Sequence, residues 1–345
     1  MTDPTNPYKH LYENPNGVGD QRPTALQIVR DQGVVGTYAG KVALVTGGTN
    51  GIGLETARAL HATGVDVFIT ARDATKGDKV RQDILSTSEG KGCFKIIMMD
   101  MDSLESVRNA AKSFLNQSDK LNILINNAGI MGTPYSLTKD GFERQFGVNH
   151  LAHFLLTNLL LPVLERSATA KLASRVVNVS SSSHRHAVVS WEHFNSHPII
   201  YNGEVAYGQS KTANIWMSNY LDRVYGPRGV HSLSLGPGGI WTGLLAYTPP
   251  DLVAAFKESP EIAPNMQSAE QGAATTLWAA VGKGWEGRGG EYLHDCRIAP
   301  PETGDLYSVM SSFAAPWVRG REGDEDRLWE MSEKLVGVES HNTSH

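Results

Sequence analysis

Cysteine is scarce in this sequence, and no apolar run is long enough to cross a membrane. Cys93 and Cys296 are the only cysteines among 345 residues and lie far apart, which excludes a disulfide framework and offers no zinc-binding spacing. The most apolar stretch, residues 151–164, is too short for a bilayer and includes polar side chains. It therefore predicts a buried helix rather than a membrane span.

Charge imbalance and targeting signals are lacking as well. The formal net charge is only −5, with 19% charged residues, so electrostatics give no reason to expect nucleic acid or an anionic membrane as a partner. The polar, proline-containing N-terminus has no apolar segment typical of a signal peptide, and the C-terminus matches no lipidation or peroxisomal motif. We therefore expect a cytoplasmic protein in a reducing compartment.

What the sequence does contain is a regular alternation of short apolar runs and helical patterns from Lys41 onward. Continuous apolar strands separated by helices are typical of a parallel sheet covered on both faces. We predict a single doubly wound α/β (Rossmann) domain over residues 41–300, with a seven-stranded parallel sheet. The predicted strands are 42–46, 65–70, 94–99, 121–126, 175–180, 230–235 and 290–295.

The two ends of the chain predict extensions of this domain. Residues 1–40 form an N-terminal extension with a short helix near 24–32, and residues 301–345 form a C-terminal extension with a helix near 324–337. Apolar side chains on both helices are spaced to dock on the body. They are Leu26, Ile28 and Val29 in the first helix, and Leu328, Met331, Leu335 and Val336 in the second.

A glycine-rich loop follows the first predicted strand, over residues 46–53. Glycines allow a sharp turn and a close approach of the backbone to a pyrophosphate, and the N-terminal end of the next helix attracts it. The strand before the loop and the helix after it favour this interpretation over a tight turn without a ligand. The expected cofactor contacts here are Gly47, Thr49, Asn50, Gly51, Ile52 and Gly53.

Two tyrosines stand four residues ahead of a lysine: Tyr135 before Lys139, and Tyr207 before Lys211. The first pair lies in a predicted turn, whereas the second begins a long helical pattern in which residues four apart share a face. A tyrosine has a pKa of about 10, and a nearby ammonium lowers it. We therefore expect Tyr207 to be an acid/base and Lys211 to tune it.

Further motifs follow the predicted strands in order. Asn-Asn-Ala-Gly (126–129) ends the fourth strand, serines end the fifth, and Pro-Gly-Gly (237–239) ends the sixth. Together with the glycine spacing and the tyrosine–lysine pair, this order resembles the short-chain dehydrogenase/reductase family over residues 41–300, closest to the retinol dehydrogenase and WW-domain oxidoreductase-like branch. The resemblance implies hydride transfer between a nicotinamide cofactor and a carbonyl or alcohol.

The resemblance also implies roles for individual residues. Lys211 would bond the nicotinamide ribose, and Ser181 would orient the substrate oxygen, with the adjacent Ser180, Ser182 and Ser183 as alternatives. Asn149 would help hold a water chain to the lysine, and the alternative is an asparagine that kinks the helix without a catalytic part. Asp100 would meet the adenine, and Thr242 the nicotinamide carboxamide. The remaining implied cofactor contacts are Met101, Asn127, Ala128, Gly129, Pro237, Gly238 and Ile240.

The choice of cofactor depends on the end of the second predicted strand. An acidic residue there would bond the ribose 2′-hydroxyl of NAD, but the position is Ala71, and Arg72 follows. Because a guanidinium grips a phosphate through two parallel hydrogen bonds, we predict NADP(H). The alternative is that Arg72 only pairs with Asp73 at the surface.

Two segments, at about 182–206 and 239–266, are expected to shape the substrate pocket because aromatic and apolar residues usually line such pockets. They favour a lipophilic or aromatic carbonyl or alcohol. The residues concerned are Trp191, Phe194 and Tyr201, then Trp241, Leu244, Leu245, Tyr247, Leu252 and Phe256. The resemblance also allows a homo-oligomer. One departure from the branch is Gly236, where relatives tend to have histidine or asparagine.

Competing interpretations have less support. Ser181 and His184 lack the nucleophile elbow of a serine hydrolase. His193 and His197 have a zinc-like spacing but no evident third ligand, so we predict no metal. A non-redox protein on the same scaffold, either a cofactor-binding module or an isomerase or cyclase, stays open, since a fold does not fix a function.

Overall fold

One eight-stranded sheet organises the protein. The computed structural model describes residues 6–195, 198–302, 312–321 and 323–339. Its strands are ordered β3-β2-β1-β4-β5-β6-β7-β8, and β1 to β7 run parallel. The strands are β1 (Val42–Val45), β2 (Asp66–Ala71), β3 (Phe94–Met98), β4 (Ile123–Asn126), β5 (Ser174–Val179), β6 (Val230–Gly236), β7 (Tyr292–His294) and β8 (Arg297–Ile298).

The predicted doubly wound α/β fold is confirmed, and the seven parallel strands lie close to their predicted positions. The prediction of seven strands is short by one, because β8 pairs antiparallel with β7. Asp295 and Cys296 form the turn between them, both with positive φ, at 52° and 51°. A two-residue strand has no readable periodicity, and this hairpin turn lacks the glycine that usually marks one.

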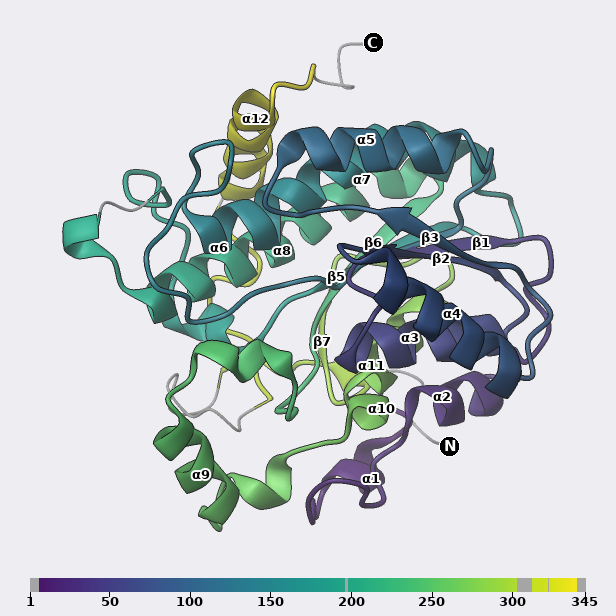
Figure 1. Cartoon of the computed structure of the whole chain (residues 1–345), viewed down its shortest axis with the longest axis horizontal. Helices are drawn as coiled ribbons and strands as arrows, with labels where there is room; N and C mark the ends of the chain where they lie inside the picture. The colour runs from purple at the N-terminus through teal and green to yellow at the C-terminus, as the bar shows by residue number, and fades with distance from the viewer. Residues whose placement is uncertain (1–5, 196–197, 303–311, 322, 340–345) are drawn as a thin grey trace.

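Helices cover both faces of the sheet (Figure 1). On one face α5, α7, α8 and α12 share a core with the strands, and on the other face α2, α3 and α11 share a second core. The strands are buried almost throughout, which is why they read as continuous apolar runs. The helices are α1 (Lys9–Tyr12), α2 (Ala25–Asp31), α3 (Gly51–Ala62), α4 (Ala74–Thr87), α5 (Leu104–Leu115), α6 (Arg144–Phe146), α7 (Ala152–Ser167), α8 (Gly203–Tyr225), α9 (Pro250–Glu258), α10 (Ala269–Gly272), α11 (Ala274–Val281) and α12 (Asp324–Val336).

Helices α6 and α7 form one apolar helical stretch, Arg144–Ser167, joined by a π-helical turn at Gly147–Leu151. Within the described residues it is the stretch long and apolar enough to cross a membrane, yet 89% of its apolar window is buried inside the protein. Helix α7 packs on β4 and β5 and lies beside α5, which is the position of a core helix.

Both terminal extensions contain the helices that the sequence predicts. Helix α2 buries Ile28 and Val29 against α11 and α3, and α12 packs on α8 with Leu328 and Val336 buried. The central contact of α12 is Trp329, which the predicted apolar stripe omits. Its ring stacks on Tyr220 with centroids 4.2 Å apart.

Candidate active site

The candidate site lies where the chain reverses its direction of winding, between the adjacent strands β1 and β4. Thr46, directly after β1, joins the two strand ends. Its hydroxyl oxygen accepts hydrogen bonds from the backbone N–H groups of Asn127 and Ala128, at 2.9 and 3.0 Å. Asn127 in turn donates through Nδ2 to the Thr46 carbonyl at 2.8 Å. The glycine loop and the Asn-Asn-Ala-Gly motif are therefore one connected unit.

Close packing explains two of the predicted glycines. Gly47 has a φ of +67°, a conformation that favours glycine. A Cβ at Gly53 would lie 2.4 Å from the Gly47 carbonyl oxygen and 2.5 Å from Asn127 Nδ2, which no side chain could occupy. Helix α3 begins at Gly51, and no side chain caps its N-terminus. Its first N–H groups thus point at the loop without a capping partner, which is the arrangement that fits a dinucleotide phosphate.

At the end of β2 the structure separates Arg72 from its predicted surface partner. Asp73 caps α4, accepting from the backbone of Thr75 and Lys76 at 2.8 and 3.1 Å. Arg72 is exposed, and among the described residues no ion pair joins it to Asp73. Ala71 is buried and carries no polar group that could bond a ribose.

Asp100, after β3, is held by a lysine from a distant loop. Lys139 Nζ lies 3.0 Å from its carboxylate. Partial burial acts to raise the pKa of Asp100, but the hydrogen bonds from Lys139 and from the Asp102 amide, with the nearby Arg72 charge, lower it overall. Met101, the neighbour of Asp100, is buried.

The side chains of the Tyr135–Lys139 pair do not meet. Its two side chains go to different partners: the Tyr135 ring contacts the edge of Tyr201 with centroids 5.4 Å apart, and Lys139 binds Asp100. The same spacing in sequence therefore produces no shared site here.

Tyr207 and Lys211 do share a face, near the start of α8. Both are buried, and Lys211 Nζ lies 5.5 Å from the centroid of the Tyr207 ring. The ammonium donates to the carbonyl of Val179, the last residue of β5, at 3.0 Å. The pair is thus fixed between α8 and the carboxyl edge of the sheet.

Burial dominates the protonation of this pair. It raises the pKa of Tyr207 to about 12, although a hydrogen bond with Ser181 acts to lower it. Burial also lowers the pKa of Lys211 to about 8. Burial therefore outweighs the lowering of the tyrosine pKa that is expected from the Lys211 ammonium. The ammonium faces the ring and bonds Val179, so its effect is smaller than the cost of ionising a buried phenol.

Ser181 follows β5 and begins a 3₁₀ turn at Ser182–His186. Its carbonyl accepts from His184 Nδ1 at 2.6 Å, and His184 Nε2 accepts from the Ala315 N–H at 3.1 Å. Burial lowers the pKa of His184 to about 3, so the ring is neutral at physiological pH. A neutral ring can donate through Nδ1 and accept through Nε2. The adjacent Ser180 instead donates to the Lys211 carbonyl at 2.8 Å. Of the two, only Ser181 bonds Tyr207.

Asn149 lies within the π-helical turn and pairs with the backbone of Ile130, just after the Asn-Asn-Ala-Gly motif. Its Nδ2 donates to the Ile130 carbonyl, and its Oδ1 accepts from the Ile130 N–H, both at 2.9 Å. A Cβ at Gly129 would lie 3.3 Å from Asn149 Oδ1 and 3.5 Å from Lys211 Nζ. The structure thus brings Asn149, Gly129 and Lys211 together.

His153 extends this network and was not singled out by sequence. Its Nδ1 donates to the Asn149 carbonyl at 2.8 Å, and its Nε2 lies 2.9 Å from the Thr46 hydroxyl. Burial lowers its pKa to about 4, so it stays neutral. A histidine within an otherwise apolar run indicates a buried polar contact, but the run alone does not reveal that Asn149 and Thr46 are its partners.

The loop after β6 reaches the glycine loop. A Cβ at Gly51 would lie 3.2 Å from Thr242 Cγ2, and one at Gly272 would meet both Ile240 and Ile52. This contact places residues 240–242 beside residues 51–52, as a shared cofactor site requires. Pro237 and Gly238 lie at the base of the loop, where Gly238 has a φ of +91°.

The departure at Gly236 has a steric explanation. A Cβ there would lie 2.5 Å from the Tyr292 hydroxyl oxygen and 2.9 Å from His294 Cδ2. Strand β7 therefore fills the space that a larger residue at 236 would need.

The two predicted substrate segments differ in their packing. Trp191 stacks on Trp216 and Phe194 packs on Phe146, so these aromatic side chains contribute to the core. In the second segment α9 buries none of its residues, and Tyr247 and Leu252 are 49% and 43% exposed. The first segment exposes apolar side chains as well, at Val188, Ile199, Ile200 and Val205.

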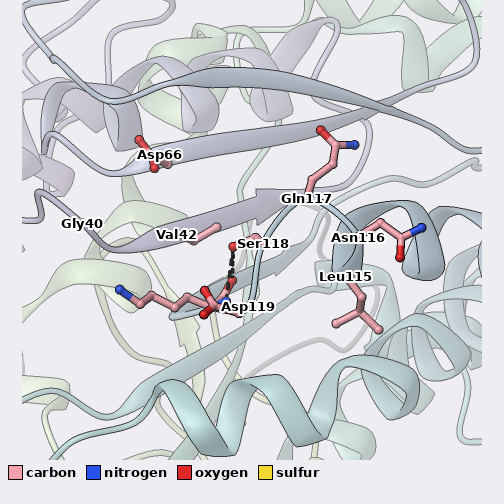
Figure 2. A pocket seen from close by; sticks show the side chains of 9 residues that line it. Gly40, Val42, Asp66, Leu115, Asn116, Gln117, Ser118 and Asp119 are labelled. Carbon is pink, nitrogen blue, oxygen red and sulfur yellow. Dashed lines mark hydrogen bonds between the residues drawn. The ribbon is translucent and has the colours of Figure 1, made fainter.

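A separate surface hollow lies at the opposite, amino edge of the sheet (Figure 2). It includes the first residues of β1 and β2, whereas the predicted site residues follow the carboxyl ends of the strands, where ligands of doubly wound folds bind. The residues lining it are Gly40, Val42, Asp66 and 115–120. No group of three or more metal-binding side chains occurs in the part of the chain that the structure describes, and His197 of the predicted pair lies outside it.

Strand order, glycine loop and a buried tyrosine–lysine pair define an α/β protein of the nucleotide-binding oxidoreductase type. The chain belongs to the short-chain dehydrogenase/reductase family: the short chain dehydrogenase family model matches residues 41–253. It is 44% identical to short-chain dehydrogenase/reductase prx1 of Penicillium roqueforti, over 96% of this chain and 95% of that one. It is 36% identical to human retinol dehydrogenase 11, over 87% and 86%.

A solved structure shows the same fold. The Pseudomonas aeruginosa RhlG/NADP active-site complex superposes with a TM-score of 0.60 and 27% identity, covering 74% of this chain and 94% of the other.

Proposed function

We propose that this protein is an NADP(H)-dependent oxidoreductase that transfers hydride between the nicotinamide and a lipophilic or aromatic carbonyl or alcohol. The observation that carries the proposal is the buried Tyr207–Lys211 pair. Within this pair, Tyr207 is hydrogen-bonded to Ser181. Lys211 Nζ lies beside Gly129, one of the expected cofactor contacts. Family membership supports the oxidoreductase class.

The protonation of Tyr207 favours the reductive direction. A bound nicotinamide dinucleotide would supply the hydride to the carbonyl carbon. The developing alkoxide then takes a proton from the Tyr207 hydroxyl, which is protonated at neutral pH because its pKa is about 12. Ser181, bonded to the same hydroxyl, orients the substrate oxygen. The Lys211 ammonium stabilises the phenolate that the transfer leaves behind.

The cofactor preference rests on Arg72. Its guanidinium is exposed at the end of β2, beside Asp100, and Asp73 is already engaged as a helix cap. A ribose 2′-phosphate offers the bidentate partner that a guanidinium prefers. The NADP named in the RhlG complex is consistent with this choice.

Arg72→Asp should weaken NADPH binding by about 10- to 100-fold, because a charge-assisted contact is lost and a repulsive carboxylate is added. Binding of NADH should change far less. Both affinities can be measured by fluorescence titration of the purified protein. Arg81→Asp is the matched control, because Arg81 is a partly exposed arginine on α4 that pairs with Asp78. Equal NADPH affinities in Arg72→Asp and the parent protein would remove the basis for the NADP(H) assignment.

The proposed substrate class follows from the segment after β6. Its exposed apolar side chains, including Tyr247 and Leu252, favour a lipophilic molecule over a sugar or a charged acid. The similarity to retinol dehydrogenase 11 agrees with a lipophilic alcohol or carbonyl.

A cofactor-consumption screen tests the function. The protein is mixed with NADPH or NADH and a panel of lipophilic, aromatic and small charged carbonyls, and absorbance at the reduced-nicotinamide band is followed. Turnover of lipophilic or aromatic carbonyls with NADPH supports the proposal. NADPH binding with no turnover in either direction across the panel would favour the non-redox alternative on the same scaffold.

The reduction should also lose activity in alkaline solution. Lys211 has a pKa of about 8, so its ammonium is fully present well below pH 8 and is lost as the pH rises above it. We expect kcat/KM to be level below about pH 7 and to fall by about tenfold per unit above pH 8. A pH series of initial rates measures this, and Lys211→Arg, which keeps its charge, should move the fall to higher pH. A kcat/KM that rises through pH 9 would contradict this role for Lys211.

A further inference from the structure

Arg22, in the N-terminal extension, makes an unusually large set of contacts for a residue outside the predicted domain. Its side chain is almost fully buried, at 5% exposure, and pairs with Asp20 at 2.9 Å. The guanidinium donates to a cluster of backbone carbonyls far along the chain. They belong to Asn265 (2.7 Å), Met266 (2.7 Å) and Pro264 (3.3 Å), with Gly17 at 3.1 Å in its own segment.

Further hydrogen bonds join the same two regions. The Gly17 N–H donates to the Pro264 carbonyl at 2.7 Å, and the Gly19 N–H donates to Gln271 Oε1 at 3.0 Å. Gln271 Nε2 donates back to the carbonyls of Asp20 and Arg22, at 3.1 and 3.2 Å. Residues 17–22 are therefore hydrogen-bonded both to residues 264–266 and to Gln271, which lie on either side of residue 267 in the chain.

These contacts meet the narrow base of the segment after β6, which we call the β6 loop, residues 240–266. Its two ends are joined by a bridge between Ile240 and Gln267 and by a 2.8 Å hydrogen bond from the Gln267 N–H to the Gly239 carbonyl. Beyond this base, α9 has no buried residue. In Figure 1 α9 lies apart from the sheet.

A loop with little packing of its own takes its orientation from its attachment points. One end of the β6 loop is fixed by strand β6. The other end, residues 264–266, turns its carbonyls toward Arg22, and a planar guanidinium with five donors can satisfy several of them at once. A lysine has one ammonium and no fixed fork, so it cannot replace this arrangement.

We propose that the N-terminal extension is a clamp on the base of the β6 loop, and that Arg22 is a positioning residue that sets how the loop covers the substrate. The clamp itself is independent of the reaction. Its effect on substrate affinity rests on the proposed function.

Limited proteolysis tests the clamp without any activity. Lys257, exposed on α9, is the only lysine or arginine in residues 240–266, so trypsin reports on this loop by cutting after it. Arg22→Met, which keeps an unbranched side chain but no donor, should increase the rate of that cut by about tenfold or more, measured by mass spectrometry. Arg30→Met is the matched control: Arg30 is in the same extension, pairs only with exposed Glu89 among the described residues, and should leave the rate unchanged.

Kinetics then separate positioning from general damage. In Arg22→Met the KM for the carbonyl substrate should rise by about tenfold while kcat changes by less than about twofold, since Arg22 is remote from the reacting atoms. The KM of Arg22→Lys should lie between those of the parent protein and Arg22→Met. Arg22→Lys replaces Arg22→Met in these experiments if the latter does not fold.

Cleavage after Lys257 at the parent rate in a folded Arg22 variant would overturn the clamp. Faster cleavage with an unchanged KM would overturn the positioning role. A protein that turns over no carbonyl leaves the proteolysis result standing, so failure of the proposed function and failure of the clamp are distinguishable.

Discussion

Tyr207→Phe should reduce turnover by on the order of 10³-fold or more while NADPH still binds. The phenol ring lies against Lys211, and only its hydroxyl bonds Ser181, so phenylalanine preserves the packing and removes the one proton donor. The measurement is the initial rate of NADPH oxidation with the best carbonyl from the screen, together with NADPH affinity by fluorescence titration.

Tyr135→Phe is the matched control, because Tyr135 belongs to the other tyrosine–lysine spacing and packs on Tyr201. It should keep near-parental rates. A Tyr207→Phe protein with more than about a tenth of the parental kcat would exclude Tyr207 as the acid, and the chemistry would then need another donor.

Trp329→Ala should destabilise the protein by about 3–5 kcal/mol, the cost of removing a large aromatic side chain from a close-packed site. Trp329 is 2% exposed. It stacks on Tyr220 of α8 and contacts Phe154 of α7 edge-on, with centroids 4.7 Å apart. Its indole N–H also donates to Glu333 at 2.8 Å. Urea unfolding followed by circular dichroism measures the change.

Met331→Ala, on the same helix but only partly buried, provides the comparison and should cost clearly less. If the two variants unfold at the same urea concentration, α12 does not depend on the aromatic contact for its docking. An early separate transition in Trp329→Ala would instead show that α12 unfolds before the sheet.

Most of the sheet could be predicted from sequence because a parallel sheet buried on both faces produces continuous apolar strands. The predicted and observed limits of β5, 175–180 against Ser174–Val179, differ by one residue. The sequence also distinguishes the two tyrosine–lysine spacings. Tyr207 begins a predicted helix, in which residues four apart share a face, whereas Tyr135 lies in a predicted turn.

What sequence could not supply is the set of long-range partners. His184 and Ala315 are 131 residues apart, and Arg22 and Asn265 are 243 apart. No local pattern encodes such contacts. The same holds for the protonation of Tyr207, because its pKa depends on how completely the folded chain removes water and on where the Lys211 ammonium points.

The bond between His184 and Ala315 bears on how this protein could be shortened or recombined with relatives. A chain cut at residue 300 would keep every residue of the proposed catalytic set, yet it would lose the amide that fixes His184 beneath Ser181. The Trp317 indole, which donates to the His184 carbonyl at 3.0 Å, would be lost with it. Chimeras that exchange C-terminal segments therefore change the hydrogen-bond partners of His184, and such exchanges should keep residues 313–318 together with the serine turn.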